Sequence, residues 1–130
     1  MTSNDMIAKL DGSDAVDQWF AGWPSFHDAE IVSLNLTRAR ESTLRVYPYY
    51  PEKPAIVEFI FEEITDLELA DFSGQNVISS LTIEAVTDQT EKKAIRLTLS
   101  PCYGLAGRID ATRLRVALVP GKSPDSVSSW

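Results

Sequence analysis

The segment Phe26-His27-Asp28-Ala29-Glu30 holds the densest group of side chains that could do chemistry. His27, the only histidine, could act as a general base oriented by Asp28, or could bind a metal ion with Asp28 and Glu30. In an extended chain, however, adjacent side chains point to opposite faces, so His27 and Asp28 would diverge. No second histidine or nearby cysteine completes a metal site. We therefore expect His27 to make a structural hydrogen bond and Asp28 to cap a turn.

Cys102 is the only cysteine, and it stands in a predicted loop from Ser100 to Arg108. A reactive thiolate needs a helix N-terminus or a neighbouring cation, and the sequence places neither beside this sulfur. We expect a buried, inert thiol. With no complete catalytic set in view, the sequence favours a protein that is not an enzyme and that carries no cofactor or metal. The alternative is an enzyme or a small metal- or ligand-binding β domain centred on His27, Asp28 and Glu30.

Acidic side chains are concentrated in the first part of the chain. Residues 1–71 contain 14 acidic and 5 basic residues, whereas residues 72–130 contain 5 acidic and 7 basic residues. One explanation is a solvated sheet face that favours solubility, and the other is a recognition surface for a basic partner. The densest cluster consists of Glu58, Glu62, Glu63, Asp66, Glu68 and Asp71.

Three tyrosines, Tyr47, Tyr49 and Tyr50, occur together with three prolines between residues 47 and 54. Tyrosine offers a large contact area at low entropic cost and is enriched in protein interfaces. The segment could therefore bind a partner, or it could be a stiff loop whose rings cover the rim of the sheet.

Length and charge limit the classes of function. A chain of 130 residues is one domain, and we expect a globular domain over residues 1–120 and a mobile tail over 121–130. A net charge of −7 argues against binding to nucleic acid or to anionic membranes. No signal peptide and no long apolar stretch is visible, and one cysteine forms no internal disulfide, so we expect a cytoplasmic protein.

The hydrophobic pattern predicts an α+β, mainly β fold. Val16, Trp19, Phe20 and Trp23 follow helical spacing, which predicts a helix over 13–23 that Ser13 caps, and a weaker helical turn fits 3–10. Beyond Pro24, alternating apolar residues predict an antiparallel sheet of about seven strands, an open or partly closed barrel, with the helix packed on it. The predicted strands lie around residues 32–36, 44–46, 57–61, 67–69, 77–85, 95–99 and 114–118.

The run Trp23-Pro-Ser-Phe-His-Asp-Ala-Glu-Ile resembles the signature of the bacterial immunity protein 50 family, and residues 31–36, 57–62 and 71–78 fit the same pattern. The resemblance implies an immunity protein that binds and neutralises a cognate toxin protein, such as a basic nuclease. On this interpretation the acidic cluster and the three tyrosines contact the toxin. The motif residues Trp23, Phe26, His27, Asp28 and Glu30 would then be structural.

Overall fold

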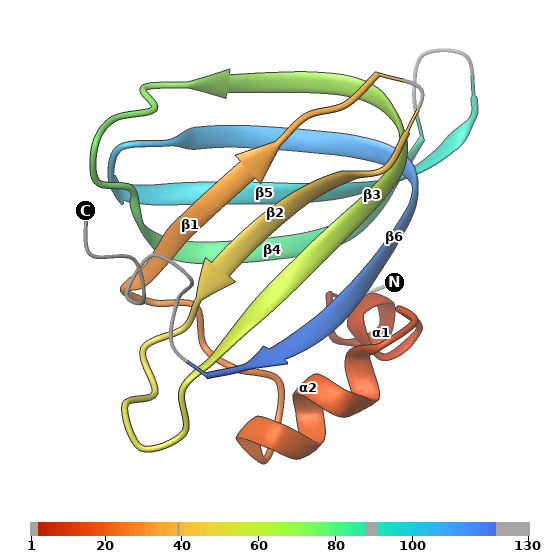
Figure 1. Ribbon diagram of the computed structural model, residues 1–130. Helices are drawn as coiled ribbons and strands as arrows, with labels where there is room; N and C mark the ends of the chain where they lie inside the picture. The colour runs from red at the N-terminus through yellow and green to blue at the C-terminus, as the bar shows by residue number, and fades with distance from the viewer. Residues whose placement is uncertain (1–2, 39, 88–90, 122–130) are drawn as a thin grey trace.

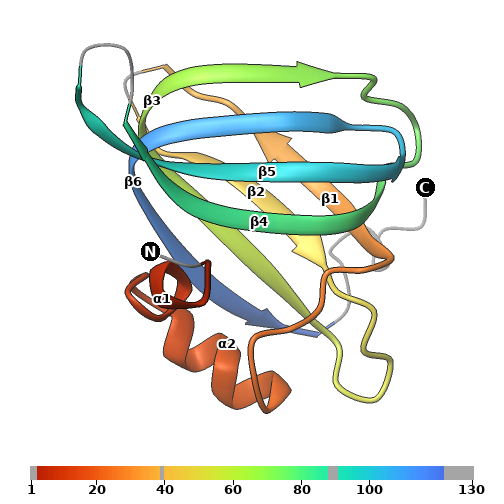
Figure 2. The ribbon, with the colours of Figure 1, turned by 180° about the vertical axis from the view of Figure 1, so that it is seen from behind.

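The computed structural model describes residues 3–38, 40–87 and 91–121 (Figures 1 and 2). Apart from Gly121, the expected C-terminal tail therefore lies outside the described residues. Among the residues described, no helix is long and apolar enough to cross a membrane. The elements are α1 (Ser3–Ala8), α2 (Ser13–Phe20), β1 (Ala29–Asn35), β2 (Ser42–Tyr47), β3 (Ala55–Ala70), β4 (Val77–Thr87), β5 (Lys93–Tyr103) and β6 (Ala106–Pro120).

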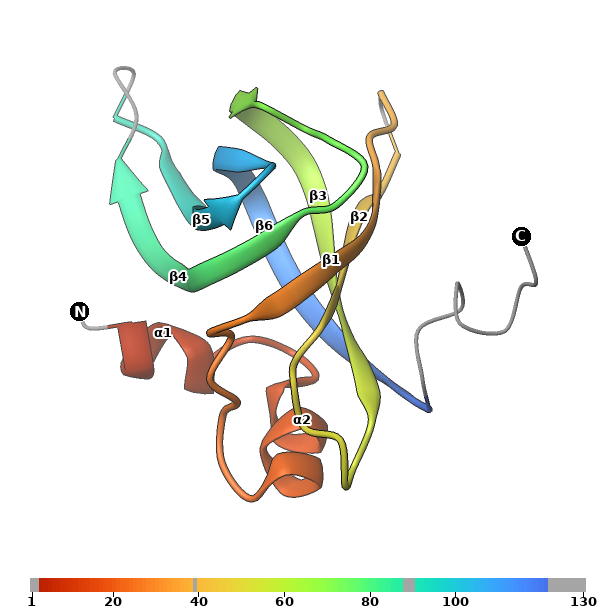
Figure 3. The same ribbon diagram turned by 90° about the vertical axis from the view of Figure 1, so that its left-hand side faces the viewer.

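The strands form one curled antiparallel sheet in the order β1-β2-β3-β6-β5-β4. β3 and β6 pair at fourteen positions, whereas the first and last strands, β1 and β4, pair only at Ala29–Ile78 and Glu30–Val77. Figure 3 shows these two strands meeting near their starts and then separating. The sheet is therefore closed only by this short contact, and the predicted antiparallel, mainly β architecture is confirmed.

The predicted number of seven strands is wrong, because the residues around 57–61 and 67–69 belong to the single long strand β3. No turn separates them: the β3–β6 pairing continues through a bulge between Ile64 and Asp66, and Glu63 adopts a positive φ of 58° there. The bulge lets the strand bend without leaving the sheet. The acidic residues around the bulge can stay in a strand because β6 places Arg113 and Arg108 directly opposite Glu62 and Glu68.

The predicted loop from Ser100 to Arg108 is also wrong. β5 continues to Tyr103 and β6 begins at Ala106, so only Gly104 and Leu105 connect them. Gly104 has a φ of 88°, which suits glycine in a tight turn, and the Leu105 N–H donates a hydrogen bond to the Asn76 side chain.

The two helices pack against the sheet. α2 contacts β6 and α1 contacts β4. The α2 helix ends at Phe20, earlier than predicted, because Ala21 adopts the left-handed conformation, with a φ of 56°. Ser13 does not cap the helix, since no side-chain cap bond forms and the residue before the helix is Gly12. The side chains at the centre of the core include Val16, Leu44, Phe59, Ile83, Leu97 and Ile109.

Candidate partner-binding surfaces

The apolar residues of the motif Trp23–Ile31 hold the connection between α2 and β1 against the core. Phe26 is only 4% exposed, and its ring centroid lies 5.7 Å from that of Trp23 and 5.9 Å from that of Phe59. Trp23 also contacts Phe59, at 6.4 Å, and Ala29 is fully buried. Burial of aromatic rings is a large source of stability, so this half of the motif has a structural role.

The polar residues of the same motif lie on the surface. The side chains of His27 and Asp28 are 66% and 63% exposed, and Glu30 is exposed as well. His27 Nδ1 lies 3.3 Å from the Ser79 carbonyl oxygen. The expectation that His27 and Asp28 diverge is wrong: Nε2 and Oδ2 are 3.6 Å apart, because Asp28 has a φ of 65° and is not extended. Within the described residues, no group of three or more His, Cys, Asp or Glu side chains is placed to hold a metal ion.

Arginines neutralise much of the acidic cluster that the sequence singled out. Glu58 Oε2 accepts a 2.6 Å hydrogen bond from Arg45 Nε, and only 15% of the Glu58 side chain is exposed. Glu62 lies 3.9 Å from Arg113. Glu63, at the bulge, is exposed. Glu58 and Glu62 are therefore paired with arginines, whereas Glu63 stays exposed, and binding of a partner by this cluster stays a prediction.

A second set of ion pairs crosses β3, β6 and β5 on the face opposite the core. Asp110, 7% exposed, accepts two hydrogen bonds from Arg96, at 2.8 and 3.0 Å, and one from Arg108, at 3.0 Å. Arg108 also donates to Asp66, at 2.8 Å, and lies 3.7 Å from Glu68. The Arg108 hydrogen bond is the main reason that the pKa of Asp66 is lowered, and the hydrogen bonds to Asp110 raise the pKa of Arg96.

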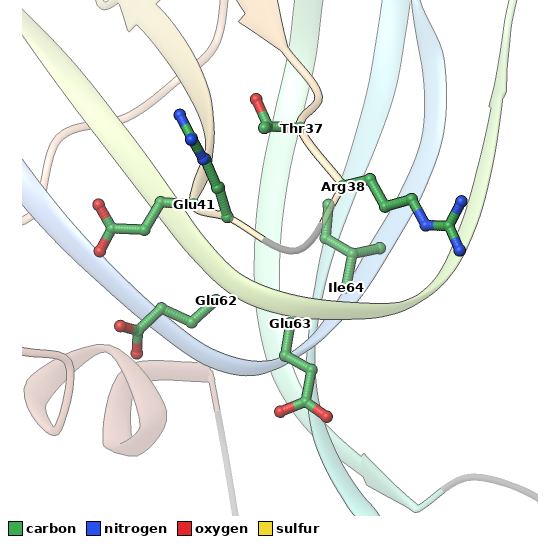
Figure 4. Close-up of a pocket in the computed structure, with 7 residues that line it drawn as sticks. Thr37, Arg38, Glu41, Glu62, Glu63 and Ile64 are labelled. Atoms are coloured by element: carbon green, nitrogen blue, oxygen red, sulfur yellow. The ribbon is translucent and has the colours of Figure 1, made fainter.

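Glu62 and Glu63 line a pocket of about 590 Å³ at the bend of β3 (Figure 4). Their side chains point in different directions, and Arg38 extends away from both. Glu41, on the same rim, accepts a 2.7 Å hydrogen bond from Arg115, which raises the pKa of that guanidinium. Because the two adjacent carboxylates do not converge, the pocket lacks the geometry of an acid–base pair.

The loop segment from Tyr49 to Lys53 and the C-terminal end of α2 form a pocket of about 420 Å³, which we call the aromatic pocket. The Phe20 and Tyr50 ring centroids are 4.9 Å apart. Trp19 Nε1–H donates a hydrogen bond to the Lys53 carbonyl oxygen, at 3.1 Å, and the Lys53 ammonium lies 4.7 Å from the Trp19 ring. Tyr49 remains 62% exposed at the rim. The pocket is lined by Gln18, Trp19, Phe20, Ala21, Tyr49, Tyr50, Pro51, Glu52 and Lys53.

The remaining predicted residues lie apart from this pocket. Tyr47 is half-buried on β2, and Asp71 is exposed just after β3, with a φ of 65°. Cys102 is exposed near the end of β5, so the expectation of a buried thiol is wrong. The Cys102 side chain is exposed because it lies at the end of β5, where the residues from Ser100 to Tyr103 face solvent.

Sequence reasoning missed two features that the fold creates. It did not place Trp19 and Phe20 beside Tyr50, because helical spacing identifies a stripe but not the loop that meets it. It also did not match the arginines to the acids. A signal was present: Arg108 and Asp110 alternate just as Asp66 and Glu68 do, as expected for facing strands.

Comparisons with models of protein families, with curated proteins and with solved structures find no match for this chain.

Proposed function

We propose that this protein is an immunity protein, which binds a cognate toxin domain and blocks it, and that it is not an enzyme. The observation that carries the proposal is the aromatic pocket, where Tyr49 is exposed beside Trp19 and Tyr50. Tryptophan and tyrosine are the residue types that most often dominate binding energy in protein interfaces. The resemblance of Trp23–Ile31 to the immunity protein 50 signature supports the same class of function.

The pocket is preorganised, which suits protein binding. The Trp19 and Lys53 contact, the Phe20 and Tyr50 ring contact and a 2.9 Å hydrogen bond from the Ser25 N–H to the Tyr50 hydroxyl hold the wall in place. A surface fixed before binding loses little side-chain entropy when a partner docks. The net charge of −7 would speed association with a basic toxin such as a nuclease.

The test is co-expression with candidate toxin domains taken from the genes that neighbour this one, followed by co-purification. We expect the intact protein to restore growth and to form a stable complex. Tyr49→Ala should weaken the complex by about thirtyfold, the change that corresponds to a hot-spot residue worth ~2 kcal/mol. Leu36→Ala is the matched control, because Leu36 is a 44% exposed apolar residue just beyond the end of β1, away from the pocket. Toxicity that persists, with no complex formed, would contradict the proposal.

A further inference from the structure

A continuous row of four residues crosses the strands where the two ends of the sheet meet. Tyr47 of β2 lies opposite Glu30 of β1, Glu30 lies opposite Val77 of β4, and Val77 lies opposite Tyr103 of β5. Residues directly opposite in antiparallel strands share a face, with Cβ atoms about 4.5–5.5 Å apart. We call these four residues the Tyr47–Tyr103 row, and Figure 3 shows the place where β1 and β4 join.

This row lies on the outer face of the sheet. Tyr47, Glu30 and Val77 have the fully buried sequence neighbours Val46, Ala29 and Ile78, and side chains alternate between faces along a strand. Tyr103, whose neighbour Cys102 is exposed, is placed in the row by its pairing with Val77. Glu30 is exposed and Tyr103 is 52% exposed, while Tyr47 and Val77 are half-buried. The row therefore presents a carboxylate with apolar and aromatic surface on both sides.

The carboxylates at this place are available to a partner. Among the residues that the structure describes, Glu30 has no ion-pair partner, and Asp28 has only His27, at 3.6 Å. Arg45 lies on the same face, two residues before Tyr47, but it is bound to Glu58 at 2.6 Å. In the part of the chain that the structure describes, no arginine or lysine therefore pairs with Asp28 or Glu30, in contrast to Glu58, Asp66 and Glu68.

We propose that the Tyr47–Tyr103 row, together with Asp28, receives an arginine- or lysine-bearing segment of the partner protein. The inference rests on the proposed function and names the chemistry of the partner. A guanidinium forms charge-assisted, often bidentate hydrogen bonds with a carboxylate, and its planar face stacks on tyrosine rings. The row supplies both kinds of contact side by side: the Glu30 carboxylate and the rings of Tyr47 and Tyr103.

The test uses a hexa-arginine peptide as the probe and the full-length, ¹⁵N-labelled protein. We expect the largest amide shifts at Asp28, Glu30, Val77 and Tyr103. The double substitution Asp28→Asn and Glu30→Gln should raise the dissociation constant at least tenfold. Asparagine suits position 28 because it tolerates the positive φ found there.

The matched control is Glu68→Gln with Glu84→Gln, which removes the same charge from exposed positions on the same sheet. We expect it to change the dissociation constant by less than twofold. Both double variants should keep their unfolding midpoints within about 3 °C of the parent, as is usual for surface substitutions. Shifts centred on residues 62–71, or equal weakening by the two double variants, would overturn the inference.

The two proposals fail in different ways. If the protein blocks the toxin but the two double variants bind the peptide equally well, the inference about the row fails and the proposed function stands. If the row binds the peptide with the expected selectivity but no toxin is blocked, the proposed function fails and the row remains a site for basic segments.

Discussion

Two acidic regions of the outer surface differ in what faces them. On β3, Glu58, Asp66 and Glu68 each lie within 4 Å of an arginine. At the start of β1, Asp28 and Glu30 have no arginine or lysine partner among the described residues. The first region is richer in acids along the sequence, but these three carboxylates are paired with arginines, whereas the two carboxylates of the second region are not.

The difference shows that a cluster of acids along the sequence does not reveal how many of them are paired on the surface of a sheet. Strand pairing places residues far apart in sequence side by side, so an acidic strand can be matched by a basic one. Pairing of Asp66 and Glu68 with Arg108 reduces the field that the β3 region offers to a partner. Binding by the β3 cluster stays a prediction, and the experiments below separate structural acids from available ones.

The largest effect is expected inside the motif that carries Asp28 and Glu30. Phe26→Ala removes a 4% exposed ring that packs between Trp23 and Phe59, and it should destabilise the protein by about 3–5 kcal/mol. Urea unfolding monitored by tryptophan fluorescence measures the change. A loss below about 1 kcal/mol would show that the apolar residues of the motif do not hold the connection between α2 and β1 against the core. The apolar and polar residues of the motif would then not differ in their structural role.

A smaller loss is expected in the ion-paired region. Asp110→Ala leaves Arg96 and Arg108 without the carboxylate that accepts three of their hydrogen bonds, and the protein should lose about 2–3 kcal/mol. The expected value is below that of a fully buried pair because the two arginine side chains remain 31% and 26% exposed. Glu68→Gln is the control, with less than ~0.5 kcal/mol, since its side chain is 79% exposed. Equal losses for the two variants would mean that Asp110 is not the centre of the network.

Much of the fold could be predicted from the sequence because local patterns decide it. Period-two alternation in β2, β4 and β5 identifies strands, and the aromatic spacing around Val16 identifies α2. The continuity of β3 could not be predicted, because the bulge near Ile64 changes which residues face the core. When the alternation of apolar and polar residues shifts by one position, the sequence pattern looks the same as one strand ending and another beginning.

The candidate surfaces could be predicted only in part. The sequence singled out Tyr47, Tyr49 and Tyr50 as one group and Glu30 as part of another. Their neighbours Trp19 and Tyr103 come from other elements, so only the tertiary fold brings them together. The pairing partners of a strand depend on topology, which single-strand patterns do not specify.

The smallest effect is expected at Asp66, whose carboxylate is exposed but hydrogen-bonded to Arg108 and to the Leu67 N–H. These bonds lower its pKa below 3.8, so the folded state binds its proton less readily than the unfolded state. The stabilisation is therefore present at neutral pH and is lost as pH falls through the lowered pKa. Asp66→Asn should be slightly less stable than the parent at pH 7, and the difference should vanish at pH values below the lowered pKa. Because the other acids titrate in both proteins, urea midpoints compared pair by pair from pH 7 to pH 2 isolate this residue. A stability difference that persists unchanged in acid would show that the Asp66 carboxylate stabilises the protein through its shape and not through its charge. The ion pair with Arg108 would then contribute nothing to stability.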